Sequence, residues 1–236
     1  MKIEAVLEFN DKGYLAQACN FPGVFGRSLY KEEALGKLLE DLKVYCQWLG
    51  KDFSREIFEV VVVKEIKSDL RVEDADTDVI FDNEKEPLSP AKYQELKRLA
   101  LKSAEDFLML YNSVPDQTAL LASPRKTFYG EVPRSAQAMY EHTKNVNDYY
   151  FGEIKVKVGN EPDILASREE GFKLLEENPD LLANKVFVGS YNELWSLAKV
   201  CRRFIWHDRI HAKALYRLAA KKFGEDQIAN SFCFRL

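Results

Sequence analysis

The three histidines of this 236-residue chain are the side chains whose spacing most clearly suggests chemistry. His207 and His211 lie four residues apart in the stretch WHDRIH, and residues at that spacing share one face of a helix. They interrupt an apolar stripe of the predicted helix, and His142 interrupts another, between Met139 and Val146. All three imidazoles are therefore expected to face the protein interior.

Two interpretations account for three interior imidazoles. Each ring can form hydrogen bonds of its own, because an unpaired buried polar group costs about 1–3 kcal/mol. Alternatively, the HxxxH pair and His142 together bind a divalent metal. Zn²⁺ binds histidine nitrogens at about 2.0–2.1 Å, and catalytic zinc sites keep a fourth position for water or substrate. Such an ion either lowers the pKa of bound water to about 7 or deprotonates a bound thiol.

Other metal motifs fit this sequence poorly. The HDxxH pattern has Asp208 where a zincin requires glutamate as the general base. A di-iron bundle requires Glu-x-x-His pairs, and no glutamate stands three residues before any histidine. Cys201 lies six residues before His207, about 240° around a helix with 3.6 residues per turn, and is a poor fourth ligand.

The helices that hold these histidines belong to a predicted all-α part, residues 89–236. Ser89 and Pro90 are typical of a helix start, and the first helix is expected to run from there to about residue 111. Three more helices are predicted over about 134–151, 167–177 and 192–223. Each carries an inward apolar stripe, which favours an up-down four-helix bundle.

Residues 1–66 are predicted to form a small α+β domain with an antiparallel sheet and one helix. KIEAVLEF, YLAQAC and EIFEVVVVKEI have strand patterns, and the helix between the last two has Ala34, Leu38 and Leu42 on one face. Residues 67–88 are acidic and lack a clear periodicity, and are expected to be a linker.

Composition and charge limit the class of protein. A hydrophobic content of 46% is enough for a packed core, and no apolar run reaches the 18 residues that a membrane span requires. The net charge of −4 gives no general attraction to nucleic acid. Four scattered cysteines and the absence of a signal-peptide pattern favour the reducing cytoplasm. A homodimer, through an exposed bundle face or a sheet edge, is compatible with these features.

The stretches YEHTKNVNDYYFGEI and FIWHDRIHAKALYRLA resemble the DinB/YfiT-like family, over about residues 89–224. The resemblance implies a four-helix bundle in which His142, His207 and His211 hold a divalent metal, most often zinc or nickel. The family includes thiol-dependent transferases, isomerases, some hydrolases and many proteins of unknown activity. The resemblance therefore predicts the metal site more specifically than the reaction.

Residues 1–66 resemble a HicB-like domain, through YLAQACNFPGVFGRSLYKEEALGKLLEDL with its PG turn and its EEAL helix start. HicB antitoxins bind a small ribonuclease toxin, so the resemblance implies a protein partner. The alternative is a structural or dimerisation module. The predicted bundle stands where an antitoxin has its DNA-binding segment, so repressor activity is not expected.

Three functions follow from these features. The first is a metal-dependent transferase that acts on a small-molecule substrate and activates a low-molecular-weight thiol. The second is metal-dependent hydrolysis of an amide or ester. The third is a non-enzymatic binding or regulatory role of the HicB-like domain, with a structural bundle.

Several further side chains have two interpretations each. Arg202, Arg203, Arg209 and Arg217 either bind an acidic cofactor or form a solvated helix face. Tyr140, Tyr149 and Tyr150 either pack in the core or donate to a developing anion at the site. Asp208 is expected to pair with Arg202 or Lys144, or to accept a hydrogen bond from a neighbouring histidine.

Overall fold

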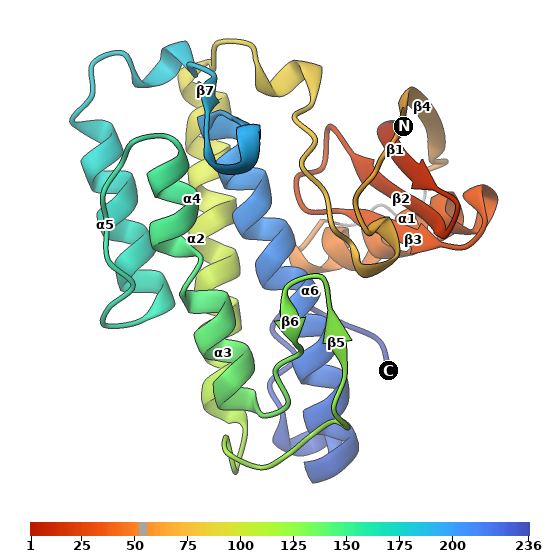
Figure 1. The fold of residues 1–236 in the computed structure, drawn as a ribbon. Helices are drawn as coiled ribbons and strands as arrows, with labels where there is room; N and C mark the ends of the chain where they lie inside the picture. Colours follow the sequence, from red (N-terminus) through yellow and green to blue (C-terminus); the bar gives the residue numbers. More distant parts are fainter. Residues whose placement is uncertain (52–55) are drawn as a thin grey trace.

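A computed structural model describes residues 1–51 and 56–236, and it places a small sheet beside a group of long helices (Figure 1). The strands of the sheet are β1 (Lys2–Asn10), β2 (Gly13–Ala18), β3 (Phe25–Ser28) and β4 (Glu59–Lys67), in the order β3-β2-β1-β4. The first three strands are antiparallel, but β4 pairs with β1 in parallel. The prediction of an antiparallel sheet is therefore wrong, and the sheet is mixed.

Helix α1 (Lys31–Trp48) explains the direction of β4. The helix connects β3 to β4 as a crossover, and a crossover returns the chain in the direction of the strand before it. Its predicted apolar face is confirmed, because Ala34, Leu38 and Leu42 are fully buried. The short strand β3 has no counterpart among the predicted elements.

Residues 68–88 form two turns of 3-10 helix, η1 (Val72–Asp74) and η2 (Asp82–Glu84), joined by extended chain. Val72, Ala75 and Phe81 of this segment are buried. The Arg203 guanidinium on the last long helix donates to the Thr77 carbonyl, so this segment lies against that helix. The division of the chain into separate domains stays a prediction.

The helical part contains α2 (Pro90–Ser113), α3 (Ala136–Lys144), α4 (Asn147–Glu153), α5 (Ile164–Glu176) and α6 (Leu197–Phe223). Helix α2 packs along α6 and α5, while α3 and α4 both contact α6. The helix predicted over 134–151 is divided in two at Asn145 and Val146. Asn147 begins α4 with its buried amide donating to the Ile164 carbonyl and to Ser167.

Serine side chains begin the two longest helices. The Ser89 hydroxyl accepts from the Lys92 amide at the start of α2, as predicted. The Ser196 hydroxyl accepts from the Lys199 amide at the start of α6, so this helix begins five residues later than predicted. Gly224 ends α6 with a φ of 101°, a conformation that favours glycine.

Short elements complete the chain. They are the hairpin strands β5 (Lys126–Thr127) and β6 (Gly130–Glu131), the hairpin strands β7 (Phe187–Val188) and β8 (Leu194–Trp195), and the turns η3 (Leu181–Ala183), η4 (Ser190–Asn192) and η5 (Glu225–Gln227). The β5–β6 hairpin stands in front of α6 in Figure 1. Both strands of this hairpin belong to the stretch LLASPRKTFYGEVP, which connects α2 to α3.

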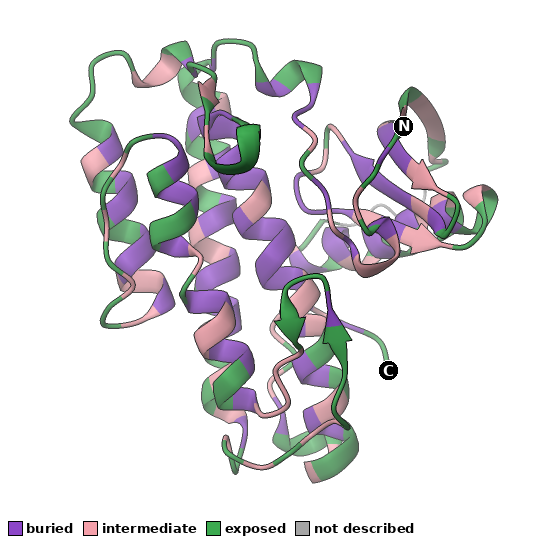
Figure 2. Cartoon of the chain, viewed as in Figure 1, coloured by how far each residue is buried: buried purple, intermediate pink, exposed green. Residues whose placement is uncertain are grey.

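One continuous cluster of buried apolar side chains runs from the sheet into the helices. Ile3 and Leu7 of β1 and Phe107 and Phe204 of α2 and α6 all belong to it and are fully buried. Figure 2 shows the buried faces turned toward one another along α2 and α6. Among the helices of the described residues, none is long and apolar enough to cross a membrane.

Candidate metal centre

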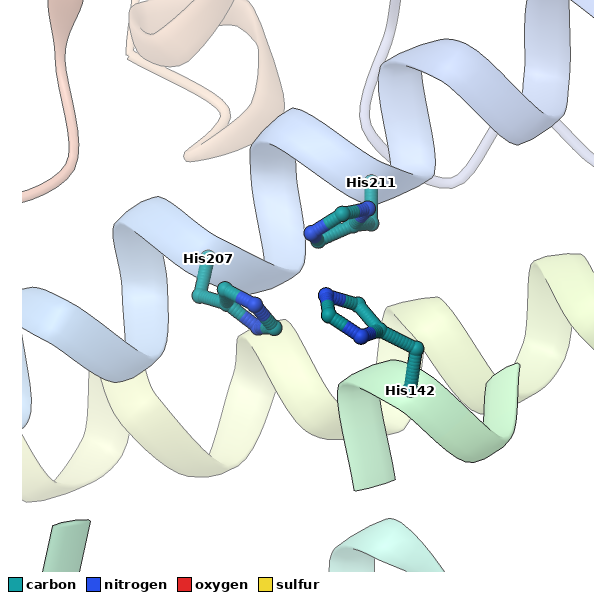
Figure 3. Close-up of side chains that lie close together, drawn as sticks. All are labelled: His142, His207 and His211. Carbon is teal, nitrogen blue, oxygen red and sulfur yellow. The ribbon is translucent and has the colours of Figure 1, made fainter. Parts of the chain in front are cut away.

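The three histidines meet between α3 and α6 (Figure 3). The ring of His142 lies 5.2 Å from that of His207 and 4.6 Å from that of His211, between centroids. The rings of His207 and His211 are 4.4 Å apart. One nitrogen of each imidazole lies within 4.8 Å of the other two. The structure thus brings together the three residues that the sequence singled out.

Two helices position these rings. His207 and His211 project from successive turns of α6, on the face that α3 covers. His142 is in the last turn of α3 and reaches across from the opposite side. Tyr129, at the tip of the β5–β6 hairpin, stacks on the outer side of His142 with 5.0 Å between ring centroids.

Burial keeps the imidazoles neutral. It lowers the pKa of His142, and it lowers the pKa of His211 to about 3, with a further contribution from His142. The pKa of His207 lies well below 6.5, because of burial first and then because of the two neighbouring histidines. A neutral imidazole is the form that binds a metal ion.

The residues present fit a divalent metal. Among the described residues, the Nδ1 atom of His207 has no hydrogen-bond partner although it is buried. For this ring, the interpretation that each histidine forms its own hydrogen bonds therefore leaves one nitrogen unsatisfied. Nitrogens bound tetrahedrally at 2.0–2.1 Å to one ion lie about 3.4 Å apart. Side chains whose nitrogens already lie within 4.8 Å reach that spacing through small rotations.

The histidines face a cavity of about 350 Å³, which is the size of a small-ligand pocket. Six parts of the chain enclose it: β3, the segment around residues 74–77, the β5–β6 hairpin, and the three helices α3, α4 and α6. Its aromatic lining residues are Phe128, Tyr129, Tyr149, Tyr150 and Trp206. The sheet and the helices therefore both contribute side chains to the space in front of the imidazoles.

Three tyrosines were expected either to pack in the core or to lie at the site, and the structure places one in the core and two at the cavity. Tyr140 is buried away from the cavity, where its hydroxyl accepts from the Ile164 amide and its ring stacks on Tyr111. Tyr149 and Tyr150 line the cavity. Tyr150 packs edge-on against His207, with 6.1 Å between the ring centroids.

Asp208 is directed away from the histidines. Its carboxylate accepts from both terminal nitrogens of Arg168, one of them at 3.1 Å, and from the Ser103 hydroxyl. The predicted pairing with Arg202 or Lys144 is wrong. Lys144 binds Glu161 at 2.8 Å, and Arg202 binds Glu84.

The four arginines of α6 have different surroundings. Arg202 and Arg209 are buried and paired with Glu84 and Asp41, so they form neither a cofactor site nor a solvated face. Arg217 is exposed. Arg203 lines the cavity.

Two further arginines of the cavity were not predicted. They are Arg27 on β3 and Arg125 beside the β5–β6 hairpin. Both are more than 80 residues from the α6 histidines in sequence, and no local pattern marks either of them.

We compared the chain with models of protein families, with curated proteins and with solved structures, and none of them matched.

Proposed function

We propose that His142, His207 and His211 hold one divalent metal ion, zinc or nickel by ligand type, at the inner end of the cavity. The observation that carries this proposal is the convergence of three neutral imidazoles on one point that opens into the cavity. Three neutral nitrogen ligands leave a position for an exogenous ligand, which is the arrangement of catalytic rather than structural zinc.

We further propose that the chain is a DinB-like protein with a HicB-like N-terminal domain. Helix α2, the pair α3 and α4, then α5 and α6 would be the four members of an up-down bundle. The positions of the three histidines, on the second member and on the last, support this assignment. The N-terminal domain would form part of the site, because Arg27 of β3 lines the cavity.

The reaction that we propose is a metal-dependent transfer to or from a low-molecular-weight thiol. A metal ion at the three histidines would lower the pKa of a bound thiol and supply a thiolate nucleophile. Tyr149 and Tyr150 would lie beside the reacting groups, since they line the same cavity. The exclusion of bulk water from this half-buried site would strengthen their electrostatic effect.

Hydrolysis of an amide or ester is the second candidate. It requires a group that removes a proton from the attacking water, and Asp76 lines the cavity. Burial raises the pKa of Asp76, which makes its carboxylate a stronger base. Asp208 cannot take this role, because its carboxylate is fully buried and bound to Arg168.

Cobalt substitution separates the two reactions. The protein is stripped of metal, loaded with Co²⁺, and titrated with free cysteine while the absorption spectrum is recorded. A thiolate-to-cobalt charge-transfer band that is lost in His142→Ala would support the thiol transferase. A spectrum unchanged by thiol, together with metal-dependent cleavage of a p-nitrophenyl ester, would favour the hydrolase. A metal site without either response would favour the non-enzymatic alternative.

A further inference from the structure

The cavity in front of the histidines carries arginine side chains without matching carboxylates. Arg27 and Arg203 line it, and neither forms an ion pair with a carboxylate within 4.0 Å among the residues that the structure describes. Each is fixed instead by a carbonyl of one short segment. Arg27 donates to Glu73 at 2.9 Å, and Arg203 donates to Thr77 at 2.9 Å.

The acidic residues of the lining compensate this charge only in part, since three arginines line the cavity beside two aspartates, Asp74 and Asp76. Asp74 lies 3.2 Å from Arg125 and 3.1 Å from Arg71, so its charge is already matched. Asp76 is half-buried; burial raises its pKa, while the Arg71 amide and the charge of Arg203 oppose that rise, so Asp76 offsets part of the charge of Arg203. Burial, and then the neighbouring guanidinium of Arg125, lower the pKa of Arg27, and Asp74 opposes this shift without cancelling it. An anion beside Arg27 would relieve this repulsion.

Unused hydrogen-bond donors lie in the same lining. In the described part of the chain, the Nε of Arg203 and the indole nitrogen of Trp206 are buried without an acceptor. Arg27 uses one of its five N–H groups on the Glu73 carbonyl, and its other donors have no acceptor among the described residues. A guanidinium with free N–H groups matches the two oxygens of a carboxylate.

From this lining we infer that the cavity binds a small organic anion with an aromatic body. Its carboxylate would be held by Arg27 with Arg203 adding positive charge, its body would lie against Phe128 and Trp206, and its other end would face the histidines. The placement of the other end rests on the proposed metal site, since an ion held by the three histidines would present its open coordination position to that end. The inference also gives the N-terminal sheet a role in ligand binding through Arg27.

Calorimetric titration with matched pairs of probes tests this inference. The full chain is titrated with benzoate, phenylacetate and 3-phenylpropionate, and with the neutral amide of each. The titrations are run on zinc-loaded protein and on chelator-treated protein, for the wild type and for Arg27→Met, Arg203→Met and Arg217→Met. Arg217 is exposed and outside the cavity, so its variant is the control. Circular dichroism and metal content are recorded for each variant.

We expect at least one carboxylate to bind about tenfold or more tightly than its amide. Arg27→Met and Arg203→Met should each remove most of this preference at unchanged metal content, and Arg217→Met should leave it intact. The inference is overturned if every amide binds as well as its acid, or if the preference survives in Arg27→Met. The comparison of each acid with its amide on the wild type tests the inference even if a variant fails to fold.

The same titrations separate the two proposals. A preference for the carboxylate that depends on Arg27 and persists in protein that binds no metal would support the anion site and contradict the metal site. Protein that binds zinc but shows no preference for any carboxylate would contradict the anion site alone.

Discussion

Asp208 directly follows the metal-site candidate His207, yet its carboxylate is bound to the guanidinium of Arg168 and both side chains are fully buried. The Arg168 guanidinium also packs over the Phe204 ring, 4.1 Å from its centroid, and donates to Asn147. This pair therefore joins α5 to α6 and to the start of α4, directly behind the histidines.

Removal of one partner of this pair should cost stability and leave metal binding intact. Asp208→Ala leaves the Arg168 charge buried without a counterion, which costs about 3–5 kcal/mol in comparable sites. The measurement is the free energy of unfolding in urea, alongside metal content of the folded protein. The double variant Arg168→Met/Asp208→Leu should be more stable than Asp208→Ala. A stable Asp208→Ala protein that loses metal would show that Asp208 serves the site instead.

The PG turn of the N-terminal part should not tolerate a side chain at Gly23. This residue has a φ of 88°, and a Cβ there would lie 2.6 Å from Cγ2 of Ile205 on α6. We expect Gly23→Ala to lower the free energy of unfolding by at least about 1–3 kcal/mol, from backbone strain alone.

Gly36→Ala is the matched control for that variant. Gly36 lies inside α1, and a Cβ there meets nothing within 4 Å. Alanine in a helix interior should raise stability by about 0.5–1 kcal/mol. Equal effects of the two substitutions would contradict both the positive φ of Gly23 and its close contact with Ile205.

Glu8 should make stability depend on pH in acid. Its buried carboxylate accepts from Thr77 at 2.6 Å and from Gln17 at 3.0 Å, and burial raises its pKa above 4.5. The folded protein then holds a proton that the unfolded chain has released, so stability falls as pH rises from 4.5 through the raised pKa. The stability of Glu8→Gln relative to wild type should therefore be greater at pH 7 than at pH 4. An equal difference at both pH values would contradict this assignment.

Metal removal should lower the thermal stability of the wild type. An ion that binds only the folded state adds about 2.7 kcal/mol when its concentration is a hundred times its Kd. Melting curves with added zinc and with chelator should differ for the wild type and coincide for His211→Ala. Lys213→Ala, a change on the same helix outside the cavity, should behave as the wild type. A zinc-dependent shift of the same size in His211→Ala would place the ion elsewhere.

Much of the helical part could be predicted because its signals are local. The i, i+4 spacing placed His207 and His211 on one face, and Ser89 with Pro90 marked the start of α2. The matching apolar stripe predicted that His142 also faces the interior, and left its convergence on the same point as one of two interpretations. The break between α3 and α4 was not predicted, because it depends on the contacts of Asn147 with α5, which no local pattern shows.

The other differences between prediction and structure also arise from contacts between parts of the chain that are distant in sequence. The parallel direction of β4 depends on how α1 crosses the sheet rather than on the strand's own sequence. The partner of Asp208 lies on another helix, 40 residues away in sequence. Arg27 reaches the cavity because β3 lies near α6, and a single arginine in a short strand carries no signal of that contact.

Metal content is the most direct test of the account. Untagged protein is analysed by plasma mass spectrometry beside the triple variant His142→Ala/His207→Ala/His211→Ala. The account predicts about one divalent ion per chain in the wild type and none in the triple variant. An absence of metal from both proteins, even after incubation with zinc or nickel, would contradict it, and the three imidazoles would then be polar groups of the core.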